Sequence, residues 1–428
     1  MVSKRLMLFC GLASFLFSVA PSSAEFRKDY LVNSCISPDT KYVACTLKAT
    51  ACADVLDPHV NSTEHQVVAL FNVASRQWKI LNQTEQINSQ PSDFSHQYLG
   101  LSGFSPDSKY LATTDTRSEK NFFNQLIFGD WGLPTIRSTI TLWDTETQKS
   151  LNSMSDVERP GALSAAGCIL SLPPFQFPDV LHGARVQEKI GLWDVKTGKH
   201  QLDLTPITMQ NPEGGEQYDS NPCSFSADGR LIAALVTISV GTTQTPAMSS
   251  WSHAVKIYDS QSGKCLKTIP ISESCREAFS PNNKILVTSG KNLEAWDVDS
   301  GKRLWKKELQ ATGTSGREAL RIAGNRVLVY FEPKLTVRMA NGSLAESHDG
   351  NYTTQVVDLT TGKLVRDFGP EKDYTKEVML SPDGKKIMTF SGKVAPPRIR
   401  VFDVDSAKLS SDIPCPMGEL EEILERQK

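Results

Sequence analysis

Residues 279–305 have the sequence FSPNNKILVTSGKNLEAWDVDSGKRLW, and this stretch contains both of the markers that decide the fold. The first marker is the Ser-Pro-Asn turn at residues 280–282, where proline presets φ and the Asn side chain can bond back to the backbone. The second marker is Trp296-Asp297, which is followed by a Ser-Gly-Lys turn at residues 300–302. The apolar run between the markers, bounded by turns, indicates a β-strand.

The second marker, two apolar residues followed by an acidic or amide residue, recurs seven times along the chain. Its copies are Leu70-Phe71-Asn72, Leu142-Trp143-Asp144, Leu192-Trp193-Asp194, Ile257-Tyr258-Asp259, Ala295-Trp296-Asp297, Val356-Val357-Asp358 and Val401-Phe402-Asp403. A short Gly-Lys turn and another apolar stretch follow most copies. We expect the aromatic residue before Asp to pack between neighbouring repeat units.

The Ser-Pro-Asp-like turn also recurs, and it alternates with the second marker. Clear copies begin at Ser37, Ser105, Ser226, Ser280 and Ser381, and weaker copies lie near Gly167 and at Gly324-Asn325. Each unit is therefore expected to contain strand a, this turn, strand b, a variable loop, strand c with the second marker, a short turn and strand d. Seven such units predict an all-β fold, a seven-bladed β-propeller of four-stranded antiparallel blades. A chance alternation of turns in a β-sandwich is the alternative.

At these markers the chain resembles the WD-repeat and quinoprotein-like (YVTN-type) β-propeller families, as a divergent, bacterial-style member. The resemblance covers about residues 30–415 and implies a fold without implying an activity. WD-repeat proteins usually carry a Gly-His pair before strand a, and this sequence contains none. Residues 295–305 are similar to the tryptophan-docking repeat of quinoproteins, but no other unit has a Trp at the position of Trp305. The resemblance therefore does not imply a pyrroloquinoline quinone enzyme, and we expect no cofactor.

The N-terminus predicts a cleaved signal peptide. Lys4 and Arg5 form a basic region, residues 6–20 are almost wholly apolar, and small residues at 22–24 suit a signal peptidase. An apolar run shorter than roughly 20 residues favours cleavage after Ala24 over a membrane anchor. We therefore predict a secreted or periplasmic protein with no integral membrane segment after cleavage; a cytoplasmic scaffold with a misassigned N-terminus is the alternative.

This interpretation divides the chain into a signal peptide at 1–24, the propeller at 25–415 and a short helical tail at 416–428. Removing the leader changes the formal net charge from −2 to −4, because Lys4 and Arg5 leave with it. Nucleic-acid binding requires a basic face, so no nucleic-acid partner is expected. Eight cysteines remain, and the sequence is compatible both with buried free thiols and with disulfides. The local disulfide that we predict joins Cys45 and Cys52.

The long connections are expected to gather on one face of the propeller. They are predicted as b–c loops at 50–66, 114–138, 172–187, 237–252 and 337–351, and as d–a connections at 82–97 and 205–221. In an antiparallel blade these two kinds of connection emerge on the same side. Several carry aromatic residues, which are candidate interface anchors: Phe122, Phe123, Phe128, Trp131, Phe175, Phe177 and Trp251, with His253 beside the last. A lid in which the loops bury their own aromatics is the alternative.

Recognisable catalytic motifs are absent from the sequence. It contains no Gly-x-Ser-x-Gly, no His-Glu-x-x-His, no Cys-x-x-Cys and no Walker loop, so we predict no metal and no catalytic residue. The sequence therefore favours a protein- or peptide-binding platform. The alternative is an enzyme, lactonase-like or quinoprotein-like, with its site at the channel mouth. That alternative requires convergent loop acids, for which the candidates are Asp130, Asp179, Glu213, Glu216 and Asp219.

Overall fold

A computed structural model describes seventeen stretches of the chain. They are residues 25–27, 33–52, 62–88, 96–119, 135–155, 157, 160–171, 190–204, 215–240, 250–272, 276–309, 319–331, 335–338, 344–347, 352–371, 375–391 and 397–415. The predicted leader at 1–24 and the predicted tail helix at 416–428 lie outside these stretches. Both remain predictions.

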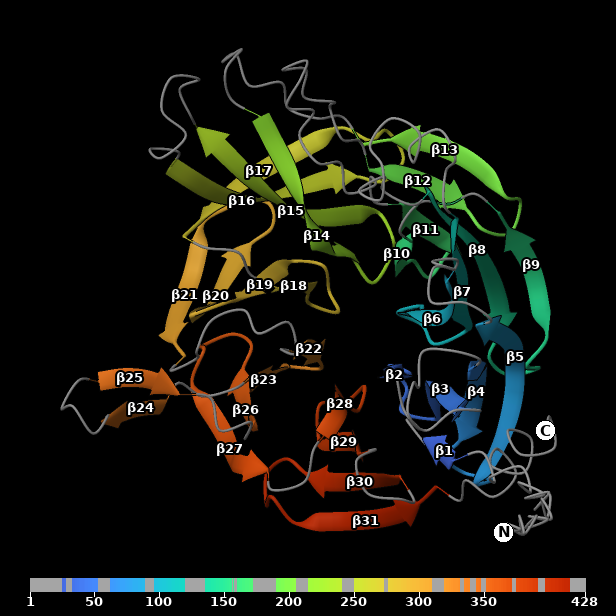
Figure 1. Ribbon diagram of the computed structural model, residues 1–428. Coiled ribbons are helices and arrows are strands. Elements are labelled where there is room, and N and C mark those ends of the chain that lie inside the picture. Colours follow the sequence, from blue (N-terminus) through green and yellow to red (C-terminus); the bar gives the residue numbers. More distant parts are fainter. Residues whose placement is uncertain are drawn as a thin grey trace, which may run out of the picture.

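Seven four-stranded antiparallel sheets stand around a central channel, as Figure 1 shows. From the innermost strand outward, blade I contains β2 (Asn33–Ile36), β3 (Tyr42–Cys52), β4 (Ser62–Asn72) and β5 (Gln77–Asn88); blade II contains β6 (His96–Phe104), β7 (Tyr110–Glu119), β8 (Thr135–Asp144) and β9 (Ser150–Met154); blade III contains β10 (Pro160–Leu163), β11 (Cys168–Ser171), β12 (Gly191–Asp194) and β13 (Lys199–Asp203); and blade IV contains β14 (Gly215–Phe225), β15 (Leu231–Val240), β16 (Ser250–Asp259) and β17 (Cys265–Ile271).

The remaining blades repeat this order. Blade V contains β18 (Arg276–Phe279), β19 (Ile285–Ser289), β20 (Asn292–Asp297) and β21 (Arg303–Glu308); blade VI contains β22 (Ala319–Ala323), β23 (Arg326–Phe331), β26 (Tyr352–Asp358) and β27 (Leu364–Glu371); and blade VII contains β28 (Thr375–Leu380), β29 (Lys386–Ser391), β30 (Arg398–Asp403) and β31 (Leu409–Pro414). A separate hairpin of β24 (Leu335–Arg338) and β25 (Leu344–Ser347) projects from blade VI (Figure 1). The fold is the predicted all-β, seven-bladed propeller.

The ring closes by direct packing between blade I and blade VII. The innermost strands β2 and β28 are in contact, and Ile36, Phe71, Phe390 and Ile399 share one buried cluster across this seam. The additional strand β1 (Glu25–Arg27) pairs with β3 of blade I and does not complete the last blade. The first and last blades are therefore joined by hydrophobic packing in the described residues, without a strand exchanged between them.

The Ser-Pro-Asp-like turns close strands a and b by a repeated set of side-chain bonds. In blade V, Ser280 Oγ donates to Asn282 Oδ1 at 2.7 Å and accepts from the Ile285 N–H at 2.9 Å. The same arrangement begins at Ser37, Ser105, Ser226 and Ser381. These bonds satisfy the polar groups of the turn and fix where strand b begins.

The second marker ends strand c in every blade, as the sequence predicts. The strand ends are Asn72, Asp144, Asp194, Asp259, Asp297, Asp358 and Asp403. In blade V, Asp297 Oδ1 accepts from both the N–H and the hydroxyl of Ser300, at 2.7 and 2.6 Å. Such bonds favour the ionised carboxylate, and they lower the pKa of Asp297 and of the equivalent Asp144, Asp259 and Asp403.

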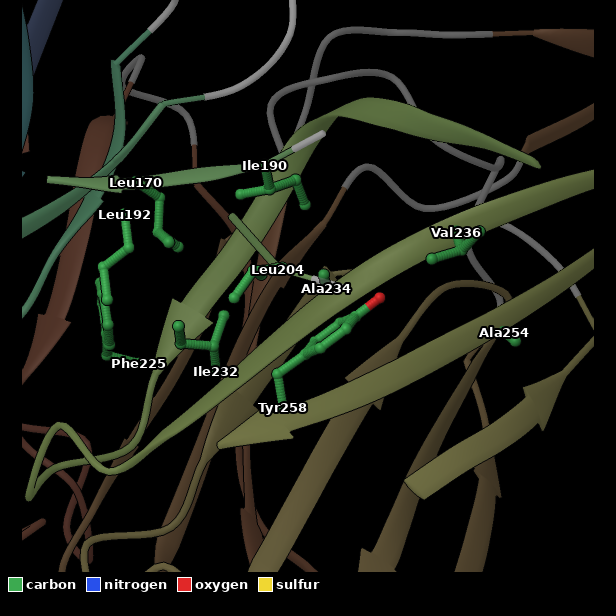
Figure 2. Packing of buried hydrophobic residues seen from close by; sticks show 10 residues of the cluster. All are labelled: Leu170, Ile190, Leu192, Leu204, Phe225, Ile232, Ala234, Val236, Ala254 and Tyr258. Atoms are coloured by element: carbon green, nitrogen blue, oxygen red, sulfur yellow. The ribbon is translucent and has the colours of Figure 1, made fainter. Parts of the chain in front are cut away.

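The residue before the marker Asp packs toward the preceding blade, which is the predicted role of the aromatic. Tyr258 is fully buried among Leu170, Leu192 and Ile232, at the boundary between blades III and IV shown in Figure 2. Trp143 and Trp296 pack similarly at the preceding boundaries of their own blades. Their indole N–H groups donate to threonines of strand b, Trp143 to Thr113 at 2.9 Å and Trp296 to Thr288 at 3.1 Å.

Trp305, the residue that resembles a docking tryptophan, reaches the next blade. It lies in β21 of blade V, and its indole N–H donates to the carbonyl oxygen of Leu359 in blade VI at 2.8 Å. Its side chain also packs with the apolar cluster between these blades. Asn152 of β9 makes the equivalent contact between blades II and III, where its Nδ2 donates to the Val195 carbonyl oxygen at 2.7 Å.

One predicted disulfide is wrong. Cys45 and Cys52 lie in the same strand, β3, so an extended chain of seven residues holds their Cα atoms roughly 23 Å apart. A disulfide requires Cα atoms within about 7 Å. Six cysteines of the described residues are free thiols, namely Cys35, Cys45, Cys168, Cys223, Cys265 and Cys415. Burial is the main cause that raises the pKa of Cys45 and Cys223 well above its usual range.

Candidate functional site

The two faces of the propeller differ in how their strands are connected. We call the face that carries the a–b and c–d turns the short-turn face, and the face with the b–c and d–a connections the loop-rich face. Each strand a runs from the loop-rich face to the short-turn face, so the first residues of β6, β18 and β28 lie toward the loop-rich face. The central channel opens between these two sets of connections.

Part of what the sequence predicts as loop on the loop-rich face is strand. In blades I, II and IV, strands b and c stay paired as far as Cys52–Ser62, Glu119–Thr135 and Val240–Ser250. The predicted loop boundaries 50–66, 114–138 and 237–252 are therefore too wide. The pleat continues because these segments contain Thr, Val and Ile, which favour strands whether or not they are apolar.

Within the described residues, strands b and c of these three blades are longer than those of the other blades. Strands β3 and β4 have eleven residues each, whereas β11 and β12 of blade III have four. The additional seven residues correspond to roughly 23 Å of strand at about 3.3 Å per residue. Blades I, II and IV therefore carry paired β-ribbons on the loop-rich face, formed by β3–β4, β7–β8 and β15–β16.

Polar side chains hold the innermost strand of blade II at this face. The Gln66 side chain of blade I donates to the Gln97 carbonyl at 2.9 Å and accepts from the Leu99 N–H at 2.9 Å, which clamps β6 from the neighbouring blade. Gln97 Nε2 donates to the carboxylate of Asp115 at 2.8 and 2.9 Å. Tyr98, between them, is 49% exposed. An aromatic side chain thus stands on a well-held strand beside the channel.

An ionic cluster lies within the channel itself. Arg321 Nη2 is 3.5 Å from Glu377 Oε2, and Arg276 also acts electrostatically on Glu377. These three residues come from the innermost strands of blades VI, VII and V. Burial raises the pKa of Glu377 to about 7, although Arg321 and Arg276 act to lower it. The carboxyl group therefore changes charge near neutral pH.

A cavity of about 600 Å³ occupies the short-turn end of the channel. Innermost strands and a–b turns of blades I, II, IV, V, VI and VII form its wall. The wall is largely apolar, with Phe104, Phe225, Phe279 and Leu380 at equivalent positions just before the turns. Arg321 is the single cation among the residues that line it.

Most of the predicted interface residues lie outside the part of the chain that the structure describes. Phe122, Phe123, Phe128, Trp131, Phe175 and Phe177 lie outside the described residues. Trp251 and His253 belong to strand β16, which begins at Ser250, and not to the loop expected there. Of the loop acids, Asp130, Asp179 and Glu213 also fall outside, whereas Glu216 and Asp219 belong to β14. The structure therefore leaves the aromatic anchors as predictions and moves two of them onto a ribbon.

Sequence reasoning missed Arg321 and Glu377. Both stand in short strands that are otherwise mostly apolar, ALRIA at residues 319–323 and TKEVML at 375–380. A charged residue inside the innermost strand of a blade is the signal that could have identified them, because that strand borders the channel. Within the described stretches, no three His, Cys, Asp or Glu side chains are arranged to hold a metal ion. None of these stretches contains a helix long and apolar enough to span a bilayer.

Comparison with known proteins gives similarity in structure alone. No protein-family model matches the sequence, and no curated protein matches it. One similar solved structure is a chain of a mitotic checkpoint complex, at 15% identity over 91% of this chain and 97% of that one, with a TM-score of 0.47. Another is the β-propeller domain of Cps50 (Swd1) from Myceliophteria thermophila, at 9% identity over 88% and 98%, with a TM-score of 0.49. The propeller architecture of this chain rests on its own seven sheets.

Proposed function

We propose that this protein is an exported β-propeller that binds a protein or peptide partner across its loop-rich face. The observation that carries the proposal is the projection of paired ribbons from blades I, II and IV on that face. Ribbons that continue the blade sheets hold their ends in place, which reduces the ordering cost of binding. Connections on a rigid scaffold are where binding residues commonly lie.

The described side chains beside the channel also favour the loop-rich face as the binding surface. Tyr98 is half exposed on β6, and its strand is fixed by the Gln66 clamp and the contact between Gln97 and Asp115. Arg117 lies 3.6 Å from Asp115 on the neighbouring ribbon strand. Tyrosine is enriched among the residues that contribute most to binding at protein interfaces. The aromatics predicted at 122–131 follow directly on this ribbon and would extend the same surface.

A matched pair of crosslinking positions tests the binding face. A photo-reactive residue is placed at Tyr98, or at Leu304 on the outer strand of blade V; both side chains are 49% exposed. We expect a specific adduct from the exported fraction with position 98 and none with position 304. The adduct should disappear when residues 120–134 are replaced by Asn-Gly, a two-residue turn suited to joining the paired Glu119 and Thr135.

Equal crosslinking at both positions, or no adduct at position 98, would exclude the loop-rich face as the interface. Export is tested separately by sequencing the N-terminus of the mature protein from its native host. Cleavage after Ala24 predicts a mature chain that starts at Glu25. A chain that retains residues 1–24 contradicts export by cleavage but leaves the binding face untouched.

A further inference from the structure

We propose that the cavity at the short-turn end of the channel binds a small monocarboxylate with an apolar body, and that Arg321 holds its carboxylate. This site lies at the opposite end of the propeller from the proposed protein-binding face and does not depend on it. The cavity has a volume of about 600 Å³, within the range of pockets that enclose small organic ligands. A macromolecular chain is therefore not needed to fill it.

The cavity wall suits the apolar part of such a ligand. Phe104, Phe225 and Phe279 contribute aromatic side chains from three blades, and turn prolines complete the wall nearer the mouth. The space is open beside Gly103, where an added Cβ would meet no atom within 4 Å. Cys35 adds a thiol that stays neutral, because burial raises its pKa far above the usual range. The wall therefore favours an uncharged hydrocarbon or aromatic group.

The guanidinium of Arg321 has N–H groups that can donate to a ligand carboxylate. Its Nη1 donates to the Leu320 carbonyl oxygen at 3.1 Å, and its Nη2 lies 3.5 Å from Glu377 Oε2. A guanidinium has five N–H groups, so three have no acceptor among the described residues. The Glu377 contact is longer than the 2.7–2.9 Å of a strong charge-assisted bond. A ligand carboxylate could use the free donors and would compete with only one weak partner.

The two acidic residues that line the cavity do not oppose an anion at Arg321. Asp39 and Asp107 stand at the rim, where each carboxylate accepts from the serine of its own turn and lies 3.4–3.5 Å from a lysine ammonium. Deeper in the channel, Arg276 adds a second positive charge next to Glu377. With Glu377 ionised, the two arginines and this carboxylate carry a net charge of +1, and one ligand carboxylate neutralises that charge.

Calorimetry and thermal unfolding of the mature protein test the proposal with 4-phenylbutyrate, its uncharged amide and 4-phenylbutylamine. We expect saturable binding of the carboxylate at one site and a higher Tm in its presence, because a ligand that binds only the folded state stabilises it. The amide and the amine should bind at least about tenfold more weakly, since neither offers two anionic oxygens to the guanidinium. Octanoate and indole-3-acetate serve as further carboxylate probes.

Three variants locate the binding. Arg321→Gln should weaken carboxylate binding at least about tenfold, whereas Arg398→Gln should leave it unchanged; these two side chains are 33% and 36% exposed, and Arg398 pairs with Asp412 outside the cavity. Ala278→Phe places a ring in the cavity wall and should remove binding while the protein remains folded. This variant keeps the test valid if Arg321→Gln does not fold.

The proposal is overturned if none of the three carboxylates binds at about 10 mM, which corresponds to a binding free energy weaker than about −3 kcal/mol. It is also overturned if the amide binds as tightly as the acid, or if Ala278→Phe binds with wild-type affinity. A tripeptide with a free C-terminal carboxylate is included as an additional probe. Binding of that peptide without binding of the small acids would assign the cavity to a peptide C-terminus instead.

Discussion

The two ends of the same blades follow different rules. At the short-turn end, five a–b turns share a Ser hydroxyl bond of 2.6–2.7 Å to the Asp or Asn two residues on. At the loop-rich end, strand b varies from four residues in β11 to eleven in β3. Local side-chain bonds thus fix where a blade stops on one face, and the described residues of the other face show no comparable repeated bond. The repeated turns position the blades at the short-turn end, and the strand lengths at the loop-rich end can therefore differ between blades.

The largest expected effect comes from the seam that closes the ring at the short-turn end. Phe71 is fully buried between blades I and VII, and its ring centroid lies 4.9 Å from that of Trp78. Phe71→Ala should lower the free energy of unfolding by about 3–5 kcal/mol, because it leaves a cavity that the surrounding sheets cannot close. Urea unfolding followed by tryptophan fluorescence measures the change.

Phe128→Ala is the matched control from the connection at 120–134. If this side chain is an interface anchor, its removal should change the free energy of unfolding by no more than about 0.5 kcal/mol. A loss comparable with that of Phe71→Ala would contradict the contrast between the two ends. It would favour the alternative in which the connections pack on one another as a lid over the channel.

The next effect concerns the channel between the two ends and depends on pH. The pKa of Glu377 rises from 4.5 to about 7 on folding, so the folded state binds more protons than the unfolded state across this range. Stability should therefore fall as pH rises from about 4.5 through 7. Glu377→Gln removes this loss and should stabilise the protein at pH 8 by up to about 3 kcal/mol, with little effect near pH 4.

Asp412→Asn provides a control of opposite sign. The hydrogen bond from Arg398 lowers the pKa of Asp412, so this carboxylate stabilises the folded state above its unfolded pKa and loses that contribution as pH falls. The Asn variant should therefore be less stable than the wild type at pH 8, whereas Glu377→Gln is more stable. Urea unfolding of both variants at pH 4 and pH 8 measures these differences. If Glu377→Gln is less stable than the wild type at pH 8, burial does not raise the pKa of Glu377 as stated.

The contrast between the two ends also explains which features of the structure the sequence predicts and which it does not. The seven blades follow from local chemistry, because Asp297 with Ser300 and Ser280 with Asn282 form their bonds within two or three residues. Strand ends on the loop-rich face were misplaced because polar strands such as 114–119 have no apolar period to mark them. Arg321 and Glu377 meet across a separation of 56 residues, and only the packing of blade VI against blade VII brings them together. A contact of that kind leaves no pattern in sequence spacing.

The smallest effect compares two glycines in turns of the short-turn face. Both have positive φ, +70° at Gly384 and +68° at Gly198, so alanine costs about 1 kcal/mol at either from backbone strain alone. An added Cβ at Gly384 would lie 2.7 Å from the Ala323 carbonyl oxygen of the neighbouring blade, whereas at Gly198 it would meet nothing within 4 Å. Gly384→Ala should therefore be destabilised by about 1 kcal/mol more than Gly198→Ala, as measured by urea unfolding. If both variants lose the same free energy of unfolding, the turns of adjacent blades can move apart without a measurable cost. The short-turn face would then be uniform because each turn forms its own bonds, and contact between neighbouring turns would contribute nothing.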